Sequence, residues 1–180
     1  MKKKLIVSIL LLTPLLLFSL ILKRTSLSEL AASSDLILRA EVLHSRSAWD
    51  ENQEMIWTDS QLHIQEIYKG MASAREINVR QRGGQVGPVM LEVPGVGLLV
   101  PGEEVILFLK EHEGRFRIHS MELGKFVLLD NPENGVRMVS TIMPVEDIYD
   151  APAAKRSRDE VTHKPIPYLE FINRLQTILE

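Results

Sequence analysis

Short segments in which apolar and polar residues alternate follow one another through most of this 180-residue chain. Each segment is bounded by glycine, proline, asparagine or aspartate, the residues that favour turns. Alternation puts the apolar side chains of a strand on one face, where they can form a core. The pattern predicts about seven short strands, at 36–43, 56–67, 76–80, 104–109, 115–119, 125–129 and 136–141.

Two features modify this β pattern. The alternation slips before Ile67, which predicts a bulge or bend in the second strand. Glycine and proline punctuate the stretch from Gly83 to Gly102, so this stretch is predicted to be either a long loop or a loop around a short strand at 89–93.

The run at 104–109 is almost continuously apolar, which is typical of a central strand buried on both faces.

Two helices are predicted at the ends of the strand region. Ser26 and Glu29 match the S-x-x-E capping box, after which Leu27, Leu30 and Ala31 share a helical face. At the C-terminus, residues 167–179 form an amphipathic pattern with proline in the first turn. Its predicted apolar stripe is Leu169, Ile172, Leu175, Ile178 and Leu179. The fold class is therefore mainly β, a small OB-like β-barrel with two peripheral helices, and a β-sandwich is the alternative.

The first 24 residues have the layout of an export signal. Three lysines precede an apolar run at 5–22, and Lys23 and Arg24 follow it. The absence of an A-x-A cleavage pattern favours a retained anchor over a cleaved signal peptide, and the positive-inside rule leaves the C-terminal part outside the cytoplasm. We expect a single-pass cell-membrane protein, or a secreted one if the leader is cleaved. The predicted division is leader 1–24, barrel domain 25–145, linker 146–165 and C-terminal helix 166–180.

Composition narrows the function classes. The chain has no cysteine, so it has neither a disulfide nor a thiol nucleophile, and no thiolate metal site. All 24 acidic residues but only 16 of the 21 basic residues lie after residue 24, which gives that part a formal charge of −8. Such a domain repels nucleic acid, so we expect no nucleic-acid partner. No phosphate loop or G-x-S-x-G motif occurs, and no cofactor is predicted.

The order of several motifs resembles that of a group of uncharacterised bacterial exported proteins. Those proteins are similar to the netrin-like module of tissue metalloprotease inhibitors, an OB-type barrel. The resemblance covers about Leu27 to Leu129 and is carried by Ser34–Val42, Trp49, Ile56–Thr58, Ile67–Gly70, Gln81–Gly84, Pro101–Leu109 and Gly124–Phe126. The inhibitors use an N-terminal cysteine against the protease zinc, and this chain has no cysteine. The resemblance therefore implies the fold and leaves open a binding role through another loop.

The candidate binding residues are aromatic, basic and glycine residues near that loop. Trp49 and Trp57 flank a predicted hairpin at 50–54 and could present an aromatic pair to a partner, although a tryptophan can equally plug the end of a barrel. Arg82, Gly83 and Gly84 could offer a charge and backbone N–H groups to an anion, although paired glycines more commonly permit a sharp turn.

Acidic and histidine residues give a weaker signal. The five histidines have no metal-ligand spacing, although His63 and His119 could meet across strands, and we predict no metal site. Glu103, Glu111 and Glu122 are the acids that a hydrolase would use, but no catalytic signature accompanies them.

These observations favour a non-enzymatic, exported or membrane-anchored module. We expect it to bind another cell-envelope or extracellular protein, for example a protease that it modulates, through the Gly83–Pro101 loop or the Trp49–Trp57 hairpin. The alternative is an envelope hydrolase or a carbohydrate-binding protein that uses surface acids.

Overall fold

The computed structural model describes residues 25–141, 148 and 164–180. The predicted leader lies outside these residues, and so does nearly all of the predicted linker. Among the described residues, no helix is long and apolar enough to cross a membrane. The described part is mainly β, with a short helix at each end, which confirms the general fold class.

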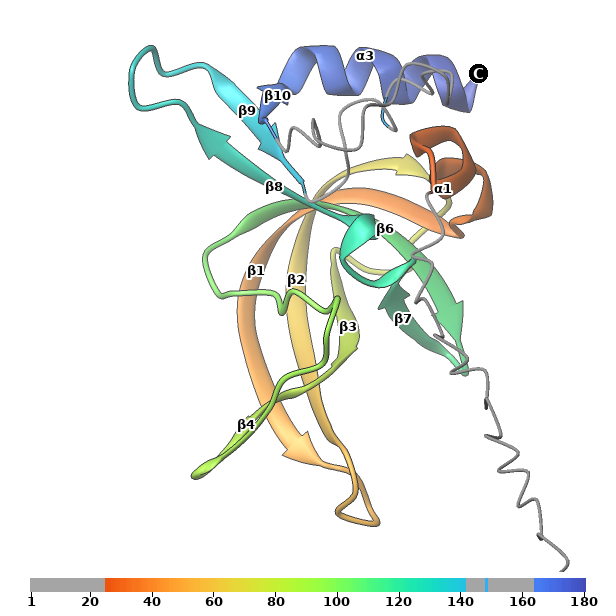
Figure 1. Ribbon diagram of the computed structural model, residues 1–180. Helices are drawn as coiled ribbons and strands as arrows, with labels where there is room; N and C mark the ends of the chain where they lie inside the picture. The colour runs from red at the N-terminus through yellow and green to blue at the C-terminus, as the bar shows by residue number, and fades with distance from the viewer. Residues whose placement is uncertain (1–24, 142–147, 149–163) are drawn as a thin grey trace, which may run out of the picture.

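The elements follow the predicted order closely (Figure 1). They are α1 Leu27–Ser33, β1 Leu36–Trp49, β2 Ile56–Lys69, β3 Glu76–Arg82, β4 Gly84–Val86, β5 Val89–Leu91, β6 Glu104–His112, β7 Arg115–Ile118, the 3₁₀ turn η1 Met121–Gly124, β8 Lys125–Asp130, β9 Arg137–Ser140, β10 Ile166–Pro167 and α3 Tyr168–Leu179.

Five strands form a partial ring in the order β1-β2-β3-β7-β6, and β6 pairs back with β1. All the ladders of this ring are antiparallel except the one between β3 and β7, which is parallel and consists of a single residue pair, Val79 with Phe116. The other edge of β6 pairs with β8, from which β9 and β10 continue the sheet away from the ring. Strand β6 therefore belongs to both the ring and its extension.

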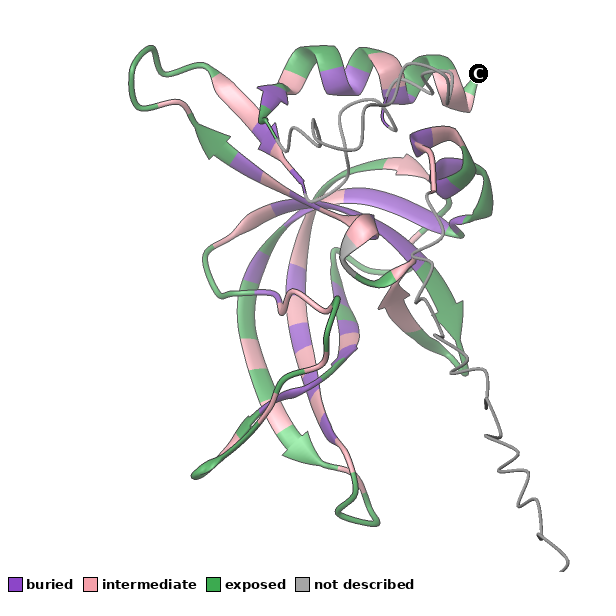
Figure 2. Ribbon diagram, viewed as in Figure 1, coloured by how far each residue is buried: buried purple, intermediate pink, exposed green. Residues whose placement is uncertain are grey.

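The buried residues, coloured purple in Figure 2, form two cores, one on each side of this sheet. Leu36, Leu38, Ala40 and Val42 of β1 face the ring interior, as predicted, together with alternate residues of β6. The other face of β6 carries Ile106 and Phe108, which pack under the two helices. The run at 104–109 is thus apolar because both faces of β6 are buried.

The strands differ from the prediction mainly in length. β1 continues to Trp49 instead of ending at 43, because its polar second half pairs with β2 along the whole hairpin. The register of that ladder shifts at Gln65 and Tyr68, which have no partner, so the predicted bulge near Ile67 is confirmed. The Gly83–Gly102 stretch contains a hairpin formed by β4 and β5. The strand predicted at 89–93 corresponds to β5, which starts at Val89 as predicted but ends at Leu91.

Both terminal helices pack on the core that contains Ile106 and Phe108, called the outer core below; the core inside the ring is called the inner core. The capping box is present, with the Ser26 side chain accepting from the Glu29 N–H and the Glu29 carboxylate accepting from the Ser26 N–H. In α3 the buried residues are Phe171, Ile172 and Leu175. The prediction of Leu169 in the apolar stripe is wrong, because its side chain is 72% exposed. Phe171 takes that place, packing its ring 4.8 Å from that of Phe126.

Candidate binding site

The segment 83–101 folds over the part of the ring formed by the second half of β1 and the start of β2, where Figure 1 shows β4 crossing the long strands. A pocket of about 830 Å³ lies beneath it. The lining is mostly apolar and comes chiefly from the segment itself, namely Met90, Leu91, Val93, Pro94, Val96, Leu98, Leu99, Val100 and Pro101. A volume of this size falls in the range of ligand-binding pockets, about 300–1,000 Å³.

The floor of the pocket is a row of hydroxyl groups on β1 and β2. Ser45 lies 2.8 Å from Ser60 and Ser47 lies 2.9 Å from Thr58, oxygen to oxygen. These hydroxyls also hold the segment above them, since Thr58 donates to the Gly83 carbonyl and Ser45 donates to the Leu99 carbonyl. The polar residues inside this end of the ring are therefore satisfied by one another and by the loop backbone.

Two further side chains fix the rest of the segment. The Gln81 amide donates to the Gly97 carbonyl and accepts from the Leu99 N–H, both at 2.9 Å. The Lys125 ammonium donates to the Leu98 carbonyl at 2.9 Å and to the Glu103 carboxylate at 2.8 Å. Leu99 is buried in the inner core. The pocket is thus built on an anchored loop, and its shape exists before any ligand arrives.

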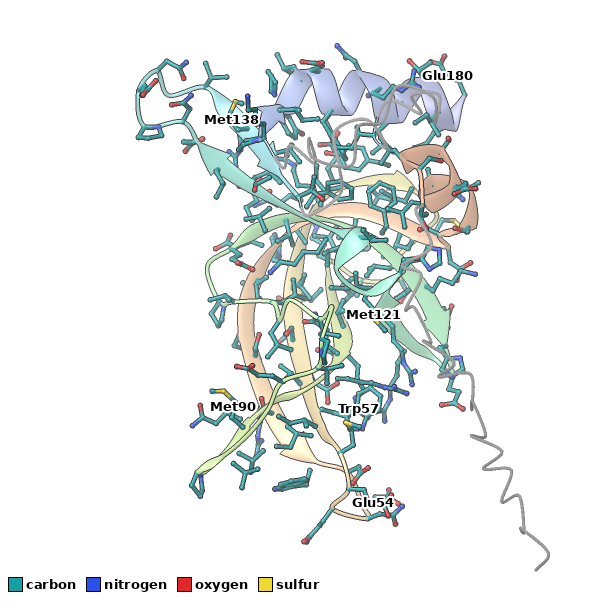
Figure 3. All side chains as sticks on the ribbon, in the orientation of Figure 1. Glu54, Trp57, Met90, Met121, Met138 and Glu180 are labelled. Atoms are coloured by element: carbon teal, nitrogen blue, oxygen red, sulfur yellow. The ribbon has the colours of Figure 1, made fainter. Side chains whose placement is uncertain are left out.

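The outer rim of the pocket exposes apolar side chains to solvent. Met90, which Figure 3 shows at the β4–β5 side of the molecule, is 60% exposed. Val100 is 53% exposed on the opposite stretch of the same segment. Exposed apolar groups beside an apolar pocket are typical of binding surfaces.

The two predicted glycines line this pocket, and their conformation explains their presence. Gly83 and Gly84 have φ values of +95° and +130°, a region that other residues rarely adopt. A Cβ on Gly84 would lie 2.3 Å from the Ser47 hydroxyl and 2.4 Å from the Thr58 hydroxyl. The glycines therefore serve the close packing of the segment on the pocket floor.

The two tryptophans do not form the predicted aromatic pair. Trp49 lies directly opposite Ile56, whereas Trp57 lies opposite Ala48, so the two indoles are on opposite faces of the hairpin. Trp49 is 38% exposed. Trp57 is half-buried on the outer face, where it contacts three arginines.

These arginines form a cationic cluster around Trp57. The guanidinium carbons of Arg80, Arg82 and Arg117 lie 5.6, 5.5 and 5.3 Å from the indole centroid. Arg80 also makes two hydrogen bonds to Asp59, at 2.7 and 2.5 Å. The hydrogen bonds from Arg80 hold the pKa of the Asp59 carboxyl below its usual value, although partial burial opposes this effect.

Sequence reasoning identified Arg82 but missed Arg80 and Arg117. A signal for them exists, because Arg80 and Arg82 on β3, and Arg115 and Arg117 on β7, are spaced by two residues and so share the outer face. The missing information was the pairing of β2 with β3, which brings Arg80 beside Trp57, and the adjacency of β3 and β7, which brings Arg117.

Of the acids considered for hydrolysis, Glu103 has structural partners, and so does its neighbour Glu104. Glu103 accepts from Lys125 and from the Val100 N–H, at the start of β6. The Glu104 carboxylate pairs with both Arg39 and Arg137. Glu111 lies in the exposed last part of β6. The side chain of Glu122 lies outside the described residues.

The histidines are dispersed. His119 hydrogen-bonds Ser33 at 2.7 Å, and its pKa is lowered by burial and by the nearby Lys110. His63 lies on β2 opposite Glu41 and Glu76, so it does not meet His119. In residues 25–141, 148 and 164–180, no group of three or more histidine, aspartate or glutamate side chains could hold a metal ion.

No known protein-family model matches this chain, and no curated protein is similar to it at a significant level.

Proposed function

We propose that this chain is a non-enzymatic, exported or membrane-anchored module that binds another cell-envelope protein through the pocket beneath residues 83–101. The observation that carries the proposal is the pocket of about 830 Å³, with its apolar lining and its exposed rim at Met90 and Val100. The export signal at 1–24 supports a partner that lies outside the cytoplasm, in the cell envelope.

The barrel itself supports the netrin-like, OB-type interpretation. An OB-fold is a five-stranded, partly open barrel, and the ring here has five strands and one seam closed by a single residue pair. Barrels of this kind commonly act through loops that a rigid scaffold holds in place. The segment 83–101 is such a loop, since hydroxyl, amide and ammonium groups of β1, β2, β3 and β8 anchor it.

The test is covalent crosslinking in intact cells that express the full-length chain, followed by mass spectrometry of the captured proteins. Met90→Glu places a charge on the apolar rim without disturbing a buried side chain. We expect it to lower capture of a specific envelope partner at least tenfold, because a charge in an apolar interface is poorly solvated.

The matched control is Met71→Glu. Met71 is 90% exposed and does not line the pocket beneath residues 83–101. This variant should capture the same partner as the wild type. Capture that is equal for both variants would overturn the proposed surface, and the mass of the mature N-terminus would show whether the leader is retained.

A further inference from the structure

The arginine cluster around Trp57 carries more positive charge than its surroundings can neutralise. Asp59 neutralises Arg80. Within the part of the chain that the structure describes, the side chains of Arg82 and Arg117 have no hydrogen bond or ion pair, and the Nε of Arg117 is buried without an acceptor. Two unpaired guanidinium groups on one indole repel each other, so an anion placed between them would stabilise the arrangement.

A small pocket lies between these groups. It has a volume of about 160 Å³ and is lined by Trp57, Arg80, Gln81, Arg82, Val93, Val96, Arg117, Ile118 and Met121. Figure 3 shows Trp57 and Met121 on the same side of the ring, near β3 and β7. No acidic residue lines the pocket. Its volume lies below the roughly 300 Å³ at which small-molecule pockets begin, so it suits a single side chain.

The identity of the side chain follows from the lining. Guanidinium groups hydrogen-bond carboxylates with two parallel N–H donors, and a half-buried site strengthens such bonds. The part of the chain after residue 24 has a formal charge of −8, so an acidic segment is repelled elsewhere on this domain. The cluster is therefore a local and selective point of attraction for a carboxylate.

The small pocket also adjoins the larger one, because Arg82, Val93 and Val96 line both. We propose that the Trp57 pocket binds the carboxylate of an aspartate or glutamate in the partner polypeptide, close in sequence to an apolar residue that occupies the larger pocket. The assignment of the carboxylate to a partner rests on the proposed function. The carboxylate site itself rests on the arginine cluster.

The test uses tryptophan emission of the purified full-length chain in an uncharged detergent. The chain has two tryptophans, so Trp49→Phe leaves Trp57 as the single reporter. The probe is an acetylated, amidated hexapeptide of alternating leucine and glutamate, and the comparison peptide has glutamine at each glutamate. We expect a saturable change in Trp57 emission with the glutamate peptide, at least tenfold weaker binding of the glutamine peptide, and weakening by added salt.

Arg82→Gln and Arg75→Gln, which each remove one positive charge, locate the site. Arg82→Gln should weaken binding of the glutamate peptide about tenfold, and Arg82→Lys should restore part of it, since lysine keeps the charge but lacks the guanidinium fork. Arg75→Gln removes the same charge from an exposed position outside the pocket and should bind like the wild type. Thermal unfolding of each variant, measured alongside, identifies any loss that comes from misfolding.

A further variant works in the opposite direction. Asp59→Asn releases Arg80 from its ion pair and should tighten binding of the glutamate peptide, an effect that damage to the fold would not produce. Equal binding of the two peptides, or equal binding by Arg82→Gln and Arg75→Gln, would overturn the carboxylate site. Equal affinity for free glutarate and for the glutamate peptide would overturn its assignment to a polypeptide.

Failure of this proposal is distinguishable from failure of the proposed function. Partner capture that is lost in Met90→Glu but unchanged in Arg82→Gln contradicts the carboxylate site and leaves the binding function standing. Peptide binding that depends on Arg82, with partner capture that does not depend on Met90, supports the carboxylate site and overturns the larger pocket as the binding surface.

Discussion

Several polar side chains of the ring and of β8 hydrogen-bond the backbone of the segment 83–101. Thr58, Gln81 and Lys125 come from three different strands, and each bonds a carbonyl or N–H of the segment 83–99. A loop with so few hydrogen bonds of its own needs such partners, because buried backbone groups without a partner are costly. These residues therefore help to determine the shape of the pocket.

Gly84 is the residue at which this arrangement is least tolerant of change. Gly84→Ala combines an unfavourable φ of +130° with a Cβ placed within 2.4 Å of two hydroxyl oxygens. We expect it to lower the free energy of unfolding by about 2–4 kcal/mol, as measured by urea denaturation. Gly87→Ala is the control, since nothing lies within 4 Å of its Cβ, and its φ of +58° costs only about 1–2 kcal/mol. Equal effects of the two substitutions would contradict close packing at Gly84.

Asp59 gives the domain a pH-dependent contribution to stability. Its folded-state pKa is lowered by hydrogen bonds from Arg80, so between that pKa and the ordinary value of about 3.9 the unfolded chain binds more protons. The contribution is fully present above pH 3.9 and is lost as the pH falls through the folded-state pKa. We expect the wild type to be more stable than Asp59→Asn at pH 7, with the difference vanishing in acid.

Urea denaturation of both chains between pH 2 and pH 7 measures that difference. Glu133→Gln, at an exposed turn position, provides a control whose stability should stay parallel to that of the wild type. A difference between the wild type and Asp59→Asn that is constant with pH would contradict the ion pair as its source.

At the element scale, α3 contacts the outer core through the aromatic ring of Phe171. Phe171 is fully buried, and Phe126 beneath it contacts Phe108 in turn, with ring centroids 4.8 and 5.2 Å apart. Phe171→Ala should therefore cost about 3–5 kcal/mol of unfolding free energy. Amide exchange should become faster in α3 and also in α1, which packs against it. Leu169→Ala, exposed on the same helix, should change stability by less than about 0.5 kcal/mol. Equal effects would mean that α3 does not depend on the outer core.

At the element scale, much of the fold could be predicted from local signals. The capping box at Ser26, the alternation in β1 and β2 and the apolar run of β6 each correspond to an observed element. The extension of β1 to Trp49 was missed because its polar residues are satisfied by hydroxyls across the hairpin. Leu169 was misassigned because apolar type alone does not say which face of α3 meets the sheet.

At the scale of the whole molecule, the candidate site illustrates what local patterns cannot contain. Arg82, Gly83 and Gly84 were found from their own residue types, and all three line the larger pocket. Arg80 joins Trp57 through the ladder between β2 and β3, Arg117 joins them only because β7 lies beside β3, and Trp49 is separated from Trp57 by the register of one ladder. Contacts between distant segments carry this information, and a single sequence does not display them.

The ring is held together less firmly between β3 and β7 than between its other neighbouring strands. Opening the ring at β1 and β6 breaks a ladder of six residue pairs, whereas opening it at β3 and β7 breaks one. Native-state openings of lowest free energy break the fewest interactions, so we expect the ring to open at this seam before its other ladders separate. The ring is in this respect a curled sheet with one weak seam, and we expect water to reach its interior first beside Val79 and Phe116 when that seam opens.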